Sequence, residues 1–250
     1  MSLSDINDKR GSLAVPLCLL LLHNRRSKQE QKIKRFDSMM NIKCFAMSCN
    51  CYIVSDENGK AVVFDPGENG AGIYDYIKRE GLELCAVMIT HAHFDHIYGL
   101  RELVECAKSD GKVVPVYVHT ADAFAMTDSQ ANLSGPLFGM PYRYTGTLKG
   151  TFDGDQINVG NMSFLVISTP GHTNGCACYI CHKEQCVFAG DVLFEGSIGR
   201  TDFPGGDMGK MKKSLERLMD LYDPYVVYPG HGNSTTIGDE RNYNPYIAGL

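Results

Sequence analysis

The sequence predicts an α/β fold in which two β-sheets pack face to face and amphipathic helices cover their outer surfaces. Short β-type runs dominate the chain, segments with helical spacing lie between them, and this alternation occurs in both halves. No stretch with the composition of a linker separates the halves. With 250 residues, 44% of them hydrophobic, the chain is long enough to bury a substantial core.

The first half is expected to begin with a small hairpin-like sheet, because two short β-type runs lead through the turn DENGK to a third. Strands are predicted at residues 42–47, 51–55, 61–65, 82–90 and 113–120. Helical spacing predicts helices at 71–81, at 97–111 and, as a short helix, at 121–126. A loop rich in glycine and proline is expected from Gln130 to Gly150.

The second half repeats this theme with further strands and one long amphipathic helix. Strands are predicted at residues 156–160, 162–169, 176–181, 185–191 and 225–230. The helix is predicted at 208–222.

The composition favours a small-molecule ligand over nucleic acid. The net charge is −5 and the pI is near 5.9, whereas phosphate binding requires clustered positive charge. The ten cysteines are spread along the chain without the spacings of a disulfide framework, so we expect them to be reduced. A reducing compartment, the cytoplasm, is therefore the predicted location. The sequence leaves the oligomeric state open.

The N-terminal segment differs from the rest of the chain. Its apolar run at 13–22 is too short for a membrane helix, which takes about 20 residues. Aspartates precede that run and basic residues follow it, which is the reverse of a signal peptide. We therefore expect no membrane association. Residues 1–39 are predicted to be an N-terminal extension, non-native or disordered, and residues 40–250 to form a single functional domain.

Candidate functional residues gather where predicted apolar strands end. Five of the eight histidines lie in three such places, and an aspartate follows a fourth strand. These residues are His91, His93 and His96 in THAHFDH, His172 in PGHT, His231 in PGHG and Asp191 in AGD. Loops at strand ends are where α/β folds place their sites. The other histidines, among them His119 and His182, are interpreted as structural or solvated.

The H-x-H-x-D-H run indicates metal binding. It packs His91, His93, Asp95 and His96 into six residues at the end of a buried strand, where so many polar groups need partners. Imidazole nitrogen and carboxylate oxygen are the ligands that zinc prefers among borderline-soft divalent metals. Seven such groups suit a pair of ions about 3.5 to 4 Å apart, a common catalytic arrangement.

In this order THAHFDH, GHT, GD and PGHG resemble the metal motifs of the metallo-β-lactamase superfamily, over about residues 41–250. The resemblance implies an αββα sandwich with two divalent ions at the strand ends, zinc first, with iron or manganese as alternatives. It further implies that His91, His93 and His172 hold one ion, that Asp95, His96 and His231 hold the other, and that Asp191 bridges them.

Within the superfamily the chain is most similar to the glyoxalase II group, the hydroxyacylglutathione hydrolases. GDVLFEGSIGRTDFPGGD and ERNYNPYI look like its short single-domain members. Class B1 β-lactamases carry a cysteine in place of Asp191, which argues against antibiotic hydrolysis. Arg200 occupies the place of a basic residue that helps to hold glutathione, so it is a candidate substrate-binding residue. The alternative for Arg200 is an ion pair with Asp202 or Asp207 that braces its loop.

The resemblance implies a hydrolase that cleaves an acyl thioester, S-lactoylglutathione or a related hydroxyacyl-thiol, with a metal-bridging hydroxide as nucleophile. Asp95 would ligate a metal and also orient the nucleophile. The main alternative is a persulfide dioxygenase of the same fold, which uses a single iron held by His91, His172 and Asp191.

The stretch Cys178 to His182 has the C-x-x-C-H spacing of c-type haem attachment, so a non-enzymatic haem protein is a further alternative. However, side chains alternate along a strand, and Cys178 and Cys181 would then point to opposite faces. We therefore interpret the stretch as a buried hairpin that carries the loops of His172 and Asp191 to one place.

Overall fold

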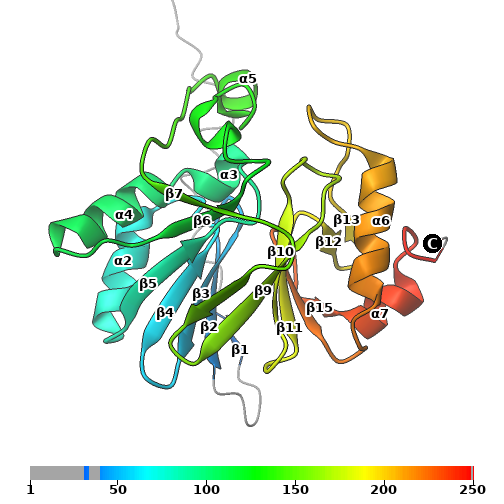
Figure 1. The fold of residues 1–250 in the computed structure, drawn as a ribbon, viewed down its shortest axis with the longest axis horizontal. Coiled ribbons are helices and arrows are strands. Elements are labelled where there is room, and N and C mark those ends of the chain that lie inside the picture. The colour runs from blue at the N-terminus through cyan, green and yellow to red at the C-terminus, as the bar shows by residue number, and fades with distance from the viewer. Residues whose placement is uncertain (1–30, 34–39, 249) are drawn as a thin grey trace, which may run out of the picture. The chain divides into compact units, whose positions relative to one another are not determined.

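Two β-sheets lie face to face in the computed structural model, which describes residues 31–33, 40–248 and 250 (Figure 1). The first sheet has the order β1 (Gln31–Ile33), β2 (Met40–Ala46), β3 (Asn50–Asp56), β4 (Lys60–Phe64), β5 (Glu83–Met88), β6 (Val116–His119) and β7 (Leu148–Thr151). The second has the order β15 (Thr235–Thr236), β14 (Val226–Pro229), β11 (Cys186–Gly190), β10 (Ala177–Cys181), β9 (Met162–Ser168) and β8 (Gln156–Val159). A small hairpin joins β12 (Leu193–Phe194) to β13 (Ser197–Ile198).

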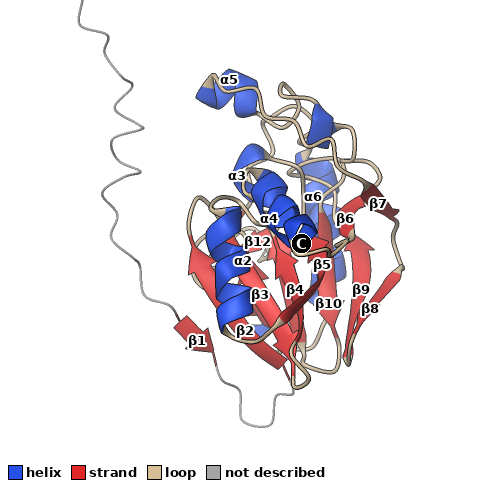
Figure 2. Cartoon of the chain, turned by 90° about the vertical axis from the view of Figure 1, so that its left-hand side faces the viewer, coloured by secondary structure: helices blue, strands red, loops and turns tan. Residues whose placement is uncertain are grey.

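Helices cover the outer face of each sheet. Those on the first sheet are α2 (Gly70–Arg79) and α4 (Leu100–Ser109), as Figure 2 shows, and those on the second are α6 (Met208–Met219) and α7 (Ile237–Tyr243). Ile77 and Leu103 pack with strand residues of the first sheet, and Leu215 packs with residues of the second. These layers, helix, sheet, sheet and helix, confirm the predicted αββα sandwich.

Aromatic side chains fill the space between the sheets. Phe64 of β4 stacks on Phe188 of β11, with ring centroids 4.0 Å apart and planes 8° from parallel. Phe164 and Tyr179 contact the ring of Phe64 edge-on at 5.5 Å. The hydroxyl of Tyr179 also donates a hydrogen bond of 2.9 Å to the carbonyl oxygen of Ile89. This layer ties the two sheets together at the level where their strands end.

Strand direction places the predicted site residues at one edge of the sandwich. β4, β5 and β6 run parallel, so their carboxyl ends lie at the same edge of the first sheet. In the second sheet β9 and β11 both run antiparallel to β10, and β14 runs parallel to β11, so these three also end together. Ligands of α/β proteins bind at such edges because the loops there converge.

Two of the predicted elements differ in the structure. The short helix expected at 121–126 is a series of turns followed by a 3-10 turn, η1 (Ala125–Thr127), because the side chain of Asp122 is buried and bonded to other loops. The loop expected from Gln130 to Gly150 contains α5 (Ser134–Phe138) and the start of β7. β7 forms by pairing with β6, a long-range contact that local spacing does not reveal.

Within the predicted N-terminal extension, β1 pairs with Ile42–Cys44 of β2. The rest of that prediction falls outside the described residues, and the division at residue 40 stays a prediction. No helix in the described part of the chain combines the length and apolarity that crossing a bilayer requires.

The C-x-x-C-H stretch is a hairpin of β10 and β11, as expected. Cys178 packs against the helices on the outer face of the second sheet, whereas Cys181 packs between the sheets. The two thiols therefore cannot attach one haem. The nine cysteines of the described residues are all free thiols.

Replacing Phe64 by alanine should lower the free energy of unfolding by about 3 to 5 kcal/mol, because a fully buried ring that anchors the sheet-to-sheet contact is lost. Urea titration followed by circular dichroism measures this change. Phe152→Ala is the control, because that side chain is 60% exposed, and it should change the value by less than about 0.5 kcal/mol. Equal losses in both variants would contradict the proposed role of this layer.

Candidate metal centre

The H-x-H-x-D-H segment combines an extended piece with one turn of helix. After β5 the chain bends at Thr90 and continues to His93, the extended N-cap residue of α3 (Phe94–Ile97). His91 and His93 precede this helix, while Asp95 and His96 stand on its first turn. His91 and His96 are fully buried. This local geometry aims four side chains into one small space.

Three imidazole nitrogens meet from two loops. His93 Nδ1 lies 3.1 Å from His91 Nε2 and 2.9 Å from His172 Nε2. Burial, aided by the neighbouring His172, lowers the pKa of His93 to about 3, so this ring is neutral at ordinary pH. Neutral rings with lone pairs directed at a common point are what a divalent metal requires.

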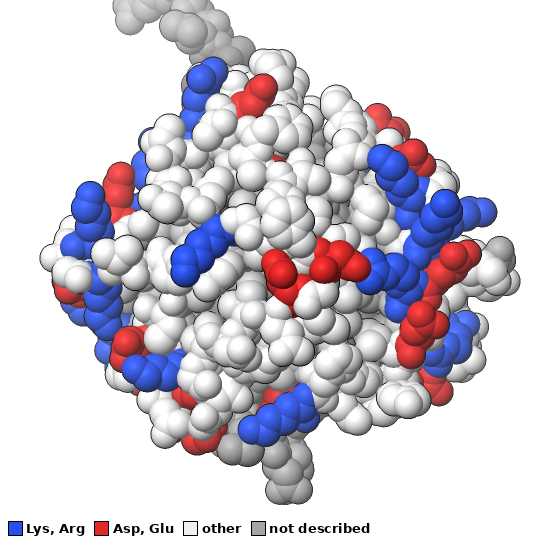
Figure 3. Space-filling model, viewed as in Figure 1, with Lys and Arg blue, Asp and Glu red and all other residues white. Residues whose placement is uncertain are grey.

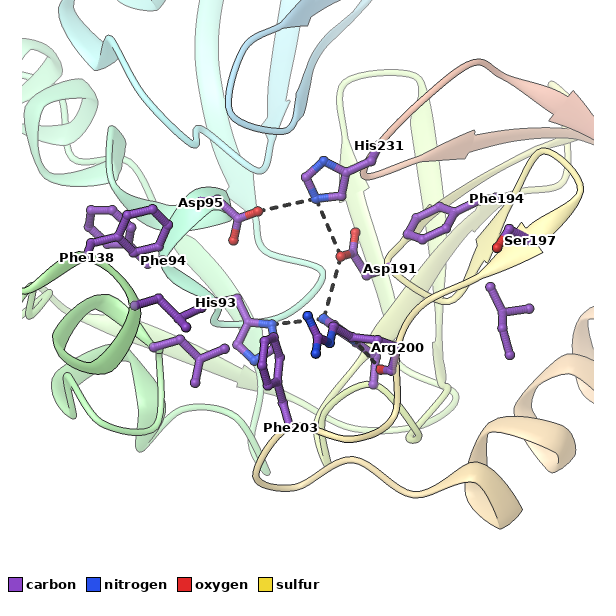
Figure 4. A pocket seen from close by; sticks show the side chains of 14 residues that line it. His93, Phe94, Asp95, Phe138, Asp191, Phe194, Ser197, Arg200, Phe203 and His231 are labelled. Carbon is purple, nitrogen blue, oxygen red and sulfur yellow. Dashed lines mark hydrogen bonds and ion pairs between the residues drawn. The ribbon is translucent and has the colours of Figure 1, made fainter. Parts of the chain in front are cut away.

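A second group forms beside the first, with a carboxylate between them. His231 Nε2 lies 3.3 Å from Asp95 Oδ2 and 3.5 Å from Asp191 Oδ2. Asp191 also approaches His96 Nε2 at 3.4 Å and His172 Nε2 at 3.5 Å. Figure 4 shows His231 joined to Asp95 on one side and to Asp191 on the other. Although burial opposes ionisation, His96 and His231 hold the pKa of Asp191 well below its usual range.

The hydrogen bonds around the rings set which nitrogen carries a lone pair. His172 Nδ1 donates to the carbonyl oxygen of Arg200 at 2.7 Å, which leaves Nε2 as the acceptor. His96 Nδ1 donates in the same way to Asp65 Oδ2 at 3.0 Å. Metal-ligating histidines commonly have their other nitrogen held by such a partner.

Asp65, which the sequence analysis missed, also controls His91. Its carboxylate accepts the hydroxyl proton of Thr90 at 2.7 Å. Because that hydroxyl has one proton, it can only accept from His91 Nδ1 at 3.2 Å, and His91 Nε2 is left with its lone pair. The signal in the sequence was an aspartate directly after the buried strand AVVF, in DPG.

Asp122, also missed, joins the two histidine loops. Its Oδ2 accepts from the backbone nitrogen of Ala92 at 3.1 Å and from the hydroxyl of Thr173 at 2.8 Å, and its Oδ1 accepts from the nitrogen of Gly175 at 2.8 Å. Ala92 lies between His91 and His93, and Thr173 follows His172. Only its position after β6 marked this residue, because the segment looked helical.

Close packing requires glycine at position 230, the first glycine of PGHG. A Cβ on Gly230 would overlap Asp191 Oδ1 and the ring of His96. Gly190, before Asp191, has φ of +50° and lies against the side chain of Thr90. A larger residue at either position would displace groups of the cluster.

The residues of the cluster fit a divalent metal. His96 Nε2, His93 Nε2 and Asp191 Oδ1 are buried without a hydrogen-bond partner, which native proteins rarely tolerate unless another group satisfies them. The donor atoms form three overlapping sets, and within each set all atoms lie within 4.8 Å of one another. The sets are His91, His93 and His172; His91, His96 and Asp191; and Asp95, His96 and His231. The structure thus brings together all seven predicted ligands. Their binding of two ions stays a prediction.

A pocket of about 460 Å³ opens onto the cluster. Arg200 lines it, but its Nε and Nη2 both donate to the carboxylate of Asp202 at 2.7 Å. The loop-bracing ion pair considered for Arg200 is therefore present, and its contact with substrate stays a prediction. His119 and His182 lie elsewhere, bonded to Ser168 and Tyr225 respectively.

The fold and this cluster together define a known class of proteins. The family model described as the metallo-beta-lactamase superfamily matches residues 45–231, and the chain belongs to that superfamily. Its members are mostly hydrolases.

Curated relatives include enzymes of this class. The chain is 37% identical over 201 residues to a probable metallo-hydrolase, YqgX, of Bacillus subtilis, a match that covers 80% of this chain and 92% of the relative. It is 30% identical over 220 residues to the hydroxyacylglutathione hydrolase GloC of Haemophilus influenzae, covering 83% of this chain and 98% of GloC.

Two solved structures are also similar. The B3 metallo-beta-lactamase BLEG-1 aligns with a TM-score of 0.74 at 35% identity, over 80% of this chain and 94% of BLEG-1. A protein named TTHA1623, crystallised in a di-iron-bound form, aligns with a TM-score of 0.70 at 30% identity, over 88% of this chain and all of that one.

Purified protein should contain about two divalent metal ions per chain, and Asp191→Ala should lose at least one of them, because Asp191 lies within reach of both groups. Elemental analysis after dialysis against metal-free buffer measures this content. The control is His182→Gln, an exposed turn residue, which should keep the full content. Full metal content in Asp191→Ala would contradict the assignment.

Asp122→Asn should weaken metal affinity by about 10- to 100-fold, because an amide cannot accept all three hydrogen bonds and the two loops lose their common anchor. Competition with a chromophoric chelator measures the affinity. Asp75→Asn, an exposed site on α2, should leave it unchanged. If both variants bind metal like the parent, the loops are held by other contacts.

Proposed function

We propose that this protein is a metal-dependent hydrolase of acyl thioesters, with S-lactoylglutathione or a related hydroxyacyl-thiol as the reference substrate. The observation that carries the proposal is the position of Asp191, within 3.5 Å of histidines from both groups at the floor of an open pocket. The likeness to hydroxyacylglutathione hydrolase GloC over almost its full length supports this choice of substrate.

The reaction consumes one water molecule. Oxygen from water bonds to the carbonyl carbon, the C–S bond breaks, and the products are a carboxylate, a thiol and a proton. A bound pair of divalent ions, zinc first with iron or manganese as alternatives, would supply Lewis acidity for the carbonyl and for the water. The thiolate leaves with a pKa near about 8.5, so little acid assistance is needed from the protein.

The chain's own residues would position this chemistry. Asp95 is partly exposed and faces the pocket, where its carboxylate can hold the attacking water and accept its proton. Asp65 and the carbonyl of Arg200 keep His96 and His172 in the tautomers described above.

The dioxygenase alternative requires only His91, His172 and Asp191. The likeness to the hydroxyacylglutathione hydrolase GloC favours the hydrolase, and metal content together with oxygen uptake separates the two. The similarity to BLEG-1 supports a second candidate activity, the opening of a β-lactam ring.

The test uses the purified full chain loaded with zinc, iron or manganese. S-lactoylglutathione should be hydrolysed, chelation should abolish activity, metal should restore it, and His172→Ala should lower kcat/KM by more than about 100-fold. Loss of thioester absorbance reports the reaction, and His182→Gln is the control. Activity that survives chelation contradicts the proposal. Oxygen uptake with a persulfide favours the dioxygenase, and cleavage of a chromogenic cephalosporin without thioester hydrolysis favours the lactamase.

A further inference from the structure

The pocket beside the cluster has apolar walls on two sides. One wall is formed by Phe94 of α3 with Leu137 and Phe138 of α5, and the other by Phe194 and Ile198 of the β12–β13 hairpin. Figure 4 shows Phe94 and Phe138 on one side of Asp95 and Phe194 on the opposite side, beyond His231 and Asp191. A scissile bond held at the cluster would therefore have apolar surface on both sides.

Two side chains of the wall at α5, Leu137 and Phe138, are not part of the core. Leu137 is 54% exposed and Phe138 is 43% exposed. The ring of Phe138 contacts the ring of Phe94, with centroids 4.9 Å apart. Exposed apolar side chains gathered at the mouth of a pocket mark a surface that binds apolar ligands.

Positive charge is scarce in this pocket. Arg200 is the only lysine or arginine among the described residues that line it. Two of its donors already bind the carboxylate of Asp202, and its guanidinium lies 3.7 Å from the centre of the Phe203 ring. Glutathione carries two carboxylates, for which these residues offer no uncommitted cation.

The basic side chains visible on the face in Figure 3 lie mainly toward its left and right margins, with acidic ones among them. On that face the lysines and arginines form no continuous basic surface that could hold an anionic carrier outside the pocket.

We propose that the preferred substrates are thioesters with an apolar acyl group, about the size of a phenyl ring, on an uncharged thiol carrier. This inference rests on the proposed thioester hydrolysis and names a preferred substrate other than the hydroxyacyl-glutathione used there as reference. The stoichiometry of the reaction is the same as above: the oxygen of water bonds to the acyl carbon, the C–S bond breaks, and the thiol leaves with a proton. Apolar surface buried on binding would replace the ion pairs that a glutathione carrier requires.

A panel of four substrates tests the preference for the acyl group and the preference for the thiol carrier separately. The acyl group is lactoyl or phenylacetyl, and the thiol is glutathione or the neutral N-acetylcysteamine. The phenylacetyl group should raise kcat/KM by at least about 10-fold on either carrier, because each buried carbon contributes to affinity. The neutral carrier should be used at least as well as glutathione.

Leu137→Ala and Phe138→Ala should each lower kcat/KM for the phenylacetyl thioester by about 10-fold, a larger loss than for the lactoyl thioester. Both side chains are exposed, so the fold should persist, and the urea midpoint checks this. Met140→Ala is the matched control, because Met140 is 44% exposed near α5 but does not line the pocket. Binding of a benzyl thioether analogue, measured by calorimetry, should weaken in the two pocket variants and not in the control.

The outcomes distinguish the two proposals. If none of the four thioesters is hydrolysed by metal-loaded protein, the proposed function fails. If thioesters are hydrolysed but lactoylglutathione is preferred by about 10-fold, or the pocket variants do not differ from Met140→Ala, the function stands and the apolar preference is wrong.

Discussion

Imidazole nitrogens and a carboxylate held against one another in a buried space are the constraint on which this structure depends. His93 Nδ1 lies 3.1 Å from His91 Nε2 and 2.9 Å from His172 Nε2, and the carboxylate of Asp191 lies beside His172. Burying such polar groups costs free energy unless each one has a hydrogen-bond partner and a further ligand at the point where the groups converge. The hydrogen-bond partners come from residues around the cluster. Asp65 accepts from His96, the carbonyl of Arg200 accepts from His172, and Asp122 accepts from Thr173 in the loop of His172. A divalent ion is the group that suits the side where the donors converge.

The sandwich brings the loops that carry these ligands together, and the packing of its core fixes their relative positions. Strands that run in the same direction in each sheet end at one edge, and the stack of Phe64 on Phe188 holds the two edges together. The hydroxyl of Tyr179 crosses from one sheet to the carbonyl of Ile89, directly before the histidine segment. Core packing and site geometry are therefore linked, because a shift between the sheets would move His172 and Asp191 away from His91 and His93.

The proposed chemistry and the proposed specificity come from different parts of the molecule. The strand-end loops carry the histidines and aspartates, whereas α5 and the β12–β13 hairpin carry the apolar walls. Exposed elements such as α5 can change their side chains without disturbing the core. The same centre can therefore serve different substrates on one scaffold.

The sequence alone determined the αββα class and the seven candidate ligands, because strand periodicity and the dense H-x-H-x-D-H run are local patterns. It also determined that Cys178 and Cys181 face opposite ways, since alternation along a strand is a local property. It did not reveal Asp65 or Asp122, whose partners lie 25 to 53 residues away, nor β7 and α5. Only tertiary structure decided that Arg200 lies at the pocket and that apolar side chains surround the cluster. These features depend on contacts between segments distant in the chain, which spacing along the sequence does not encode.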